Sequence, residues 1–341
     1  SGYLLAQSQQ CWPNSRGDIQ LTGYTKVDFP QQIALKWTYD AEGIFKSAPV
    51  ICDNKIVIGS TSGEMLCLTN QGKLLWKFKT DNAIEAPALI ENNTVYFGNL
   101  GGTLYALELE TGKLKWEYKT ENQIMGAPTL FKAGSKTILA VGSYDYYLHG
   151  VDATTGEGLW KYESDNFLNS APAIYKGKAV FGGCDGFLHL VNMTNGLSAG
   201  KVEVATYVAS SPAIVGNKAY IGDYDAGFTC IDLDTKNIVW RYQSPDDGLP
   251  FIASPAVVGN KIFIGSRDKF FYCFDIESGK IVWKKNTGSR IDASAVANNN
   301  QVLLINMRGD LMLLNQTDGS TVWSYELGAA AINTPAVINN A

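Results

Sequence analysis

The sequence predicts an all-β propeller built from four-stranded antiparallel blades. Two markers repeat along the chain with a period of about forty residues. One is a small residue followed by proline or alanine, as in Ala86-Pro87 and Ser254-Pro255. The other is tryptophan, which recurs every 39 to 44 residues apart from one interval of 80, where Gly200 takes its place. Because both markers keep one register, we expect a single structural unit repeated around a ring.

Residues 254–283 show the unit most clearly. They contain four apolar runs of strand length, separated by short clusters such as Gly259-Asn260 and Ser278-Gly279. β-branched and aromatic runs between turn residues are the signal of β-hairpins. Glycine or asparagine breaks the pattern every eight to ten residues, which excludes long helices. Four-stranded sheets packed radially protect their edges, so the sequence predicts a propeller.

The number of blades depends on the two ends of the repeat. Seven full units lie between Trp37 and Trp323. The run Lys36–Tyr39 lacks inner strands before it, and Thr334–Ile338 lacks outer strands after it, so we expect the joined ends to complete an eighth blade. Roughly twenty residues after Ala341, or residues 1–30, would supply the missing strands. The alternative is a seven-bladed ring with extra terminal strands. We expect residues 31–341 to form one propeller domain after an N-terminal segment, 1–30, whose residues 1–6 are a candidate signal-peptide remnant.

Composition excludes several classes of function. The chain is 45% hydrophobic and 18% charged, which is unlike a disordered protein. Its net charge of −5 argues against nucleic acid as a partner. No apolar run is long enough for a transmembrane helix. Two histidines and six cysteines without a C-x-x-C pair give little support for a metal or redox centre.

The turn before each tryptophan carries a specific pattern. Residues 152–160 read D-x-x-T-G-x-x-x-W, and 108–116 and 275–283 follow it closely. This pattern resembles the repeat of the pyrroloquinoline quinone (PQQ) propeller family over about residues 35–338. The resemblance implies that the tryptophans dock neighbouring blades, and that the blade containing Gly200 is the most weakly docked. The residues given this docking role are Trp76, Trp116, Trp160, Trp240, Trp283 and Trp323.

The same resemblance separates two functions. Quinone dehydrogenases of the family are longer and hold PQQ beside a calcium ion, often against a pair of adjacent cysteines. This chain has no Cys-Cys pair and few inserted loops, so we expect neither PQQ nor calcium. It is similar to the shorter, non-enzymatic, BamB-like members. They imply a non-catalytic protein-binding scaffold of the bacterial periplasm or cell envelope that assists outer-membrane protein assembly, with a protein partner and peripheral membrane association. The alternatives are a PQQ- or metal-dependent oxidoreductase and a carbohydrate-binding propeller that stacks sugars on Tyr144, Tyr146 and Tyr147.

Propeller geometry predicts which face binds a partner. Connections between blades should emerge on the same face as the turns between second and third strands. These segments vary in length and chemistry, whereas the turns of the other face are monotonous, and loops carry recognition. Aromatic and arginine side chains are common interface anchors. The predicted partner-binding residues are Tyr144, Tyr146, Tyr147, Tyr224, Phe251, Arg267 and Arg308, and the predicted channel rim is Lys46, Asn169 and Asp292.

The remaining polar candidates have structural interpretations. His149 and His189 occupy the same third-strand position in neighbouring units, which favours packing over metal ligation. Cys67, Cys230 and Cys273 also share a third-strand position and are expected to be buried hydrophobes. No cysteine pairing is predicted. Acidic residues at the second turn are expected to form turns, with a carboxylate ring for an axial cation as the alternative; they are Asp145, Asp185, Asp225 and Asp268.

Overall fold

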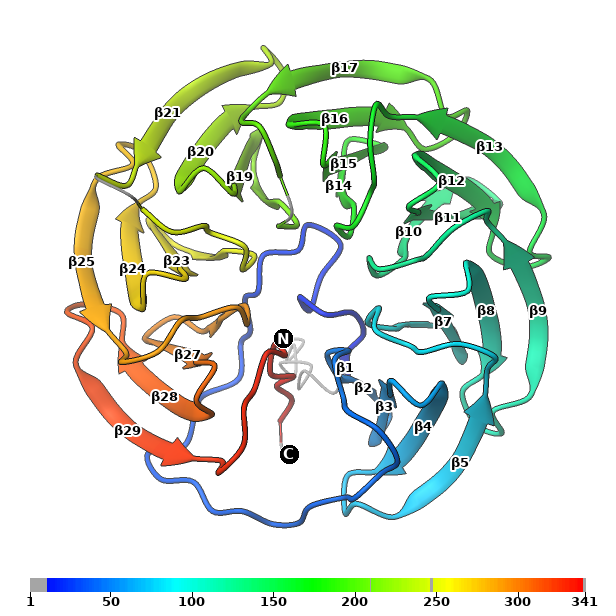
Figure 1. The fold of residues 1–341 in the computed structure, drawn as a ribbon, viewed down its shortest axis with the longest axis horizontal. Helices are drawn as coiled ribbons and strands as arrows, with labels where there is room; N and C mark the ends of the chain where they lie inside the picture. Colours follow the sequence, from blue (N-terminus) through cyan, green and yellow to red (C-terminus); the bar gives the residue numbers. More distant parts are fainter. Residues whose placement is uncertain (1–10, 209, 246–247, 340–341) are drawn as a thin grey trace, which may run out of the picture.

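The described part of the chain forms seven antiparallel sheets arranged in a ring around a central axis (Figure 1). The computed structural model describes residues 11–208, 210–245 and 248–339; the candidate signal remnant, 1–6, lies outside them. Each sheet has four strands in chain order, and the first carries an additional inner strand, β1 (Cys11–Trp12). We number the sheets as blades 1 to 7 in chain order. The predicted all-β class and four-stranded blades are confirmed.

Two strands of each blade lie nearest the axis. The innermost strands are β2 (Val50–Cys52), β6 (Leu89–Glu91), β10 (Thr129–Ala133), β14 (Ala173–Tyr175), β18 (Ala213–Val215), β22 (Ala256–Val258) and β26 (Val296–Ala297). The second strands are β3 (Lys55–Gly59), β7 (Thr94–Gly98), β11 (Lys136–Gly142), β15 (Lys178–Gly182), β19 (Lys218–Gly222), β23 (Lys261–Gly265) and β27 (Gln301–Ile305).

Two further strands complete each blade toward the outside. The third strands are β4 (Glu64–Thr69), β8 (Thr103–Glu108), β12 (Tyr147–Asp152), β16 (Phe187–Asn192), β20 (Gly227–Asp232), β24 (Phe270–Asp275) and β28 (Asp310–Asn315). The fourth strands are β5 (Leu74–Lys79), β9 (Leu114–Lys119), β13 (Gly158–Glu163), β17 (Ser198–Glu203), β21 (Asn237–Gln243), β25 (Ile281–Asn286) and β29 (Thr321–Glu326). Third strands are mostly buried, as in β8, because blades cover both of their faces, whereas outer strands such as β9 expose alternate residues.

The repeated tryptophans join each blade to the next. The indole Nε1 of Trp116 donates to the carbonyl of Ala153 in the following blade at 3.1 Å. Its ring covers Gly156, where a Cβ would approach the ring to 2.7 Å, so glycine is required at this turn. The same bond joins Trp37 to Asn70, Trp76 to Leu109, Trp160 to Met193, Trp240 to Ile276 and Trp283 to Gln316.

At Gly200 the series of tryptophans is interrupted, and a second departure from the repeat lies against it. Gly200 stands where a tryptophan is expected, and Lys236 stands where the next turn would have glycine. In the structure the two departures meet, because a Cβ on Gly200 would lie 2.6 Å from the Lys236 side chain. The aliphatic stem of Lys236 therefore lies against Gly200 and fills the space that an indole ring fills between the other blades.

A row of serine hydroxyls joins blades 4 to 7 near the axis. The N–H of Ala171 donates to Ser211 Oγ, the N–H of Ser211 donates to Ser254 Oγ, and the N–H of Ser254 donates to Ser294 Oγ, at 2.9 to 3.1 Å. These serines occupy the small-residue position of the sequence marker. The marker thus places a hydroxyl acceptor within reach of the preceding blade in blades 5, 6 and 7.

The prediction of eight blades is wrong. Between blade 7 and blade 1, residues 31–40 cross the outer side and residues 329–338 the inner side, and within the described residues neither segment forms a strand (Figure 1). An apolar groove of about 290 Å³ separates them, lined by Ile33, Trp37 and Ile338 among others. The seven-bladed alternative with an extra terminal strand fits, because β1 is that strand.

The N-terminal segment runs along the innermost strands near the axis (Figure 1). Residues 13–25 run past the innermost strands, whose N–H groups donate to its carbonyls: Ile90 to Pro13, Ile174 to Ile19, Ile214 to Gln20, Val257 to Thr22 and Ala297 to Gly23. Trp12, Arg16 and Leu21 of this segment are buried. Residues 11–30 therefore do not supply the strands of a further blade. We call residues 11–25 the plug.

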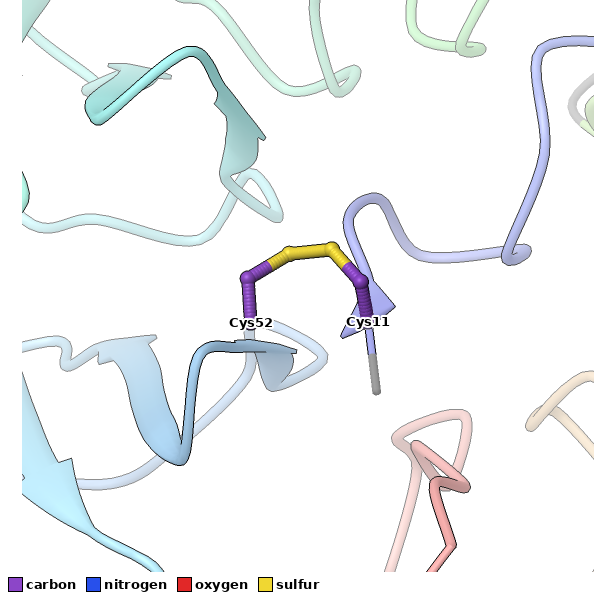
Figure 2. The surroundings of a disulfide bond; sticks show 2 residues. All are labelled: Cys11 and Cys52. Atoms are coloured by element: carbon purple, nitrogen blue, oxygen red, sulfur yellow. A yellow bond between two sulfur atoms is a disulfide. The ribbon is translucent and has the colours of Figure 1, made fainter. Parts of the chain in front are cut away.

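A disulfide holds the start of the plug. Cys11 in β1 is bonded to Cys52 in β2, across 41 residues of sequence (Figure 2). No cysteine pairing is predicted from the sequence, because the bond depends on the plug lying antiparallel to β2. Across the described part of the chain, no helix has the length and hydropathy needed to span a bilayer.

Candidate functional site

The two faces of the ring are built differently. On one face, the loop face, the first residue of each second-to-third-strand turn donates its N–H to the connection that precedes the blade. The pairs are Thr61 to Ile44, Leu100 to Ala83, Tyr144 to Gln123, Cys184 to Phe167, Tyr224 to Tyr207, Arg267 to Pro250 and Met307 to Arg290. On the opposite face, first and third turns of a blade are joined, as in the N–H of Leu109 donating to the Asn93 carbonyl. The connections between blades and the second-to-third-strand turns therefore lie on the same face, as the sequence predicts.

Aromatic side chains gather on one part of the loop face. Phe167 stacks on Tyr144 with ring centroids 4.6 Å apart and lies 5.2 Å from Tyr146. Tyr207 meets Tyr224 edge-on at 5.7 Å. The two pairs lie on the turns and connections of blades 3 to 5, and burial, with a smaller contribution from Cys184, raises the pKa of Tyr144. We call Tyr144, Tyr146, Phe167, Tyr207 and Tyr224 the aromatic arc.

Arginines continue the arc around the channel mouth. Arg267 forms a two-point ion pair with Asp292, with Nε–Oδ1 at 3.0 Å and Nη2–Oδ2 at 3.1 Å. Its hydrogen bonds to Asp292 raise the pKa of Arg267. Arg290 approaches the same carboxylate at 3.7 Å and keeps half of its side chain exposed. Arg308 binds Asp310 at 2.6 Å. Fixed guanidinium groups thus extend the aromatic surface.

The structure distributes the predicted partner-binding residues unevenly. Tyr144, Tyr146, Tyr224, Arg267 and Arg308 lie on loop-face turns, and Tyr146 and Tyr224 are 44% and 40% exposed. Tyr147 begins β12, and its ring lies under Lys161 Nζ at 5.6 Å, so it is set back from the arc.

Phe251 is a correction. It is fully buried, packing 5.4 Å from Tyr272 and 6.1 Å from Phe228. Its Cβ lies only 2.6 Å from where a side chain on Gly222 would begin. The loop folds inward because Gly222 leaves room for the ring. Phe251 therefore belongs to the core and cannot contact a partner.

The predicted rim residues each precede an innermost strand. Lys46 forms an ion pair with Glu85 at 2.8 Å, which joins blade 1 to the connection before blade 2. Asp292 holds Arg267, as described above. The Oδ1 of Asn169 is buried without a hydrogen-bond partner among the described residues.

Sequence analysis missed three residues of this surface: Phe167, Tyr207 and Arg290. All three lie in connections between blades and pair with a turn residue of the next blade. A signal existed, because each is the seventh residue after the tryptophan marker or, for Tyr207, after Gly200. Applying the repeat register to the connections would have found them.

A known protein family matches most of the chain. A family model described as "Outer membrane protein assembly factor BamB" matches residues 31–163 and 184–340. The chain belongs to the BamB family of PQQ-type propellers. No curated protein matches the sequence.

Solved structures share the fold of this BamB-family chain. BamB from Moraxella catarrhalis superimposes with a TM-score of 0.73 at 18% identity, over 89% of this chain and 92% of the other. A europium-containing methanol dehydrogenase gives 0.79 at 12% identity, over 96% and 87%. A computationally designed protein, Ika8, gives 0.75 at 17% identity, over 88% and 93%. At these identities the likeness shows the fold alone.

The residues of this BamB-family chain do not fit a metal–quinone centre. Within the described ranges, no three His, Cys, Asp or Glu side chains gather where they could hold a metal ion. The four predicted turn carboxylates already have partners: Asp145 binds His149, Asp185 binds His189, Asp268 binds Tyr272, and Asp225 accepts the Thr206 N–H.

Two identical hydrogen-bond relays lie beneath the aromatic arc. The hydroxyl of Tyr118 in β9 donates to His149 Nδ1 at 3.0 Å, and His149 Nε2 donates to Asp145 at 3.0 Å. One blade further, Tyr162 in β13 donates to His189 Nδ1 at 3.0 Å, and His189 Nε2 donates to Asp185 at 2.9 Å. Each relay crosses from one blade to the next. The histidines are buried as predicted, but each also carries a specific pair of bonds.

The first relay predicts acid sensitivity. Burial alone would raise the pKa of Asp145, but hydrogen bonds from His149 and from the Glu121 and Tyr147 N–H groups outweigh it and lower the pKa to about 2. The carboxylate therefore stabilises the fold above the unfolded-state pKa near 4, and this contribution is lost as pH falls toward 2. We expect the urea midpoint of the wild type to fall more steeply between pH 4 and pH 2 than that of Asp145→Asn. Parallel curves would contradict this account.

Proposed function

We propose that this chain is a non-catalytic protein-binding scaffold of the bacterial cell envelope that engages a protein partner through the aromatic arc and its flanking arginines. The role that fits is assistance in outer-membrane protein assembly, as the description of the matching family says of that family. The chain contributes a rigid ring, and the loop face contributes recognition.

The aromatic arc is the observation that carries the proposal. Three of its members, Tyr146, Tyr207 and Tyr224, are 38 to 44% exposed although they belong to a well-packed fold. Tyrosine and arginine are enriched among the residues that contribute most to interface affinity. The turns that present them are held by backbone hydrogen bonds in every blade, so little conformational entropy is lost on binding.

The disulfide supports an envelope location. Bonds such as Cys11–Cys52 persist in oxidising compartments, including the bacterial periplasm, and are rare in the cytosol. In this proposal a membrane-bound partner holds the chain at the membrane surface, so peripheral association requires no membrane-spanning helix of the chain itself.

Affinity capture with variants tests the proposal. Tagged wild type is expressed in the organism that encodes the chain, and proteins captured from envelope extracts are quantified by mass spectrometry. Truncating Tyr146 and Tyr224 to alanine should reduce recovery of the main partner by about tenfold or more, since each removes an exposed aromatic anchor. Both side chains are substantially exposed, so the melting temperature should hardly change.

The matched control is Leu197→Ala. Leu197 is 65% exposed in a turn of the opposite face, so this variant also removes a large apolar surface group. Its partner recovery should equal that of the wild type. Equal losses with both variants, or a loss with Leu197→Ala alone, would overturn the assignment of the loop face.

A further inference from the structure

We infer that His149 and His189 are positioning residues that hold the aromatic arc in its binding geometry. This inference rests on the proposed function, because it assigns a role to groups beneath the surface that the proposal uses. It does not make the histidines part of the contact surface, since both are buried.

The first step is where the relays lie. Asp145 sits between Tyr144 and Tyr146, and its carboxylate also accepts the Glu121 N–H from the preceding connection at 3.0 Å. Asp185 accepts the Asp165 N–H in the connection that carries Phe167. The first relay therefore fixes the turn that carries Tyr144 and Tyr146, and the second fixes the connection that carries Phe167.

The two relays lie in the same blades as the aromatic part of the loop face. The chain has two histidines, and both serve blades 3 and 4. In blade 6, below the arginine part, Tyr272 binds the turn residue Asp268 directly and no histidine intervenes. In blade 5, the matching turn residue Asp225 accepts the Thr206 N–H at 2.9 Å, and Thr229 stands where the histidines stand in blades 3 and 4. The carboxylate is thus retained with different partners, and the three-part form occurs under Tyr144, Tyr146 and Phe167.

The third step is the bonding pattern. A carboxylate can only accept, so each Nε2–H donates to its Asp, and Nδ1 of the neutral imidazole then accepts from the hydroxyl of Tyr118 or Tyr162. Each Nε2–H is then directed at a carboxylate that is 95% or more buried. This arrangement fixes the imidazole tautomer and the carboxylate orientation together, and with them the turn that follows.

A thiol beneath the arc supplies a local readout. Cys184 is buried and free, and its N–H donates to the Phe167 carbonyl at 3.0 Å. Burial raises the pKa of this thiol to about 11, so the folded protein should react slowly with a thiol reagent. Loosening of the neighbouring turn and connection would expose the sulfur without global unfolding.

The experiment measures the rate at which Cys184 reacts with a disulfide reagent, read on its peptide by mass spectrometry. His189→Phe keeps a ring but removes both bonds, and it should raise the rate by about tenfold or more. His189→Gln restores an N–H toward Asp185 and should recover most of the protection. Tyr272→Phe, the matched change in blade 6, should leave the rate within about twofold.

The readout also separates this inference from the proposed function, because it needs no partner. A His189→Phe protein that is less stable but keeps the wild-type Cys184 rate would show that the relay is only a structural support, and the inference would fail. Equal acceleration by Tyr272→Phe would do the same. Where His189→Phe does not fold, Tyr162→Phe, which removes one hydroxyl of the same relay, replaces it with the same expected direction.

Discussion

Replacing Trp116 with alanine should lower the free energy of unfolding by about 3–5 kcal/mol, the range for large aromatic residues in a core. Trp116 is 9% exposed, lies against Tyr96 with ring centroids 5.8 Å apart, and covers Gly156 of the next blade. Its removal leaves a cavity between two blades and frees the Ala153 carbonyl from the indole bond. Urea unfolding followed by fluorescence would measure the change.

Trp323→Ala is the control for this prediction. Trp323 keeps the indole bond, to the Pro30 carbonyl at 2.9 Å, but it lies in the interval without a complete neighbouring sheet and is only partly buried. Its truncation should cost about half as much, since less apolar area returns to water. Equal costs for the two tryptophans would show that the contact between blades is not what stabilises the ring.

Removing the disulfide is the second large effect. Replacing Cys11 and Cys52 with serine should lower the free energy of unfolding by about 4 kcal/mol, because the bond closes a long loop in the unfolded chain. The plug keeps its backbone bonds to the innermost strands, so the folded structure should be retained. Denaturant unfolding and near-ultraviolet circular dichroism would check both statements.

A reducing agent provides the matched comparison. It should lower the unfolding midpoint of the wild type toward that of the double serine variant and leave the variant itself unchanged. A wild type that is insensitive to reduction under unfolding conditions would contradict the assigned pairing.

The repeat could be predicted from the sequence because each of its markers acts locally. A tryptophan, a Thr-Gly turn and a small residue before proline each act within one blade or its neighbour, and they predicted the register of β-strands correctly. The count of blades failed for a related reason. Trp37 and Thr334 carry the marks of a blade, but a strand also needs partners, which a marker does not supply.

The candidate site was predictable to the extent that the repeat defines it. Tyr144, Tyr224 and Arg267 follow from turn positions in the register. Phe251 does not, because its burial depends on the absence of a side chain at Gly222, far away in sequence. The disulfide likewise depends on where the plug runs. Contacts between segments that are distant in the sequence cannot be predicted from the residues of either segment alone.

Site-specific photo-crosslinking tests the central claim most directly. A photoreactive phenylalanine is placed at position 146 on the loop face or at position 197 on the opposite face, and living cells are irradiated. The account predicts a covalent adduct with one envelope protein from position 146 and none from position 197. An adduct from position 197 with none from position 146 would contradict it.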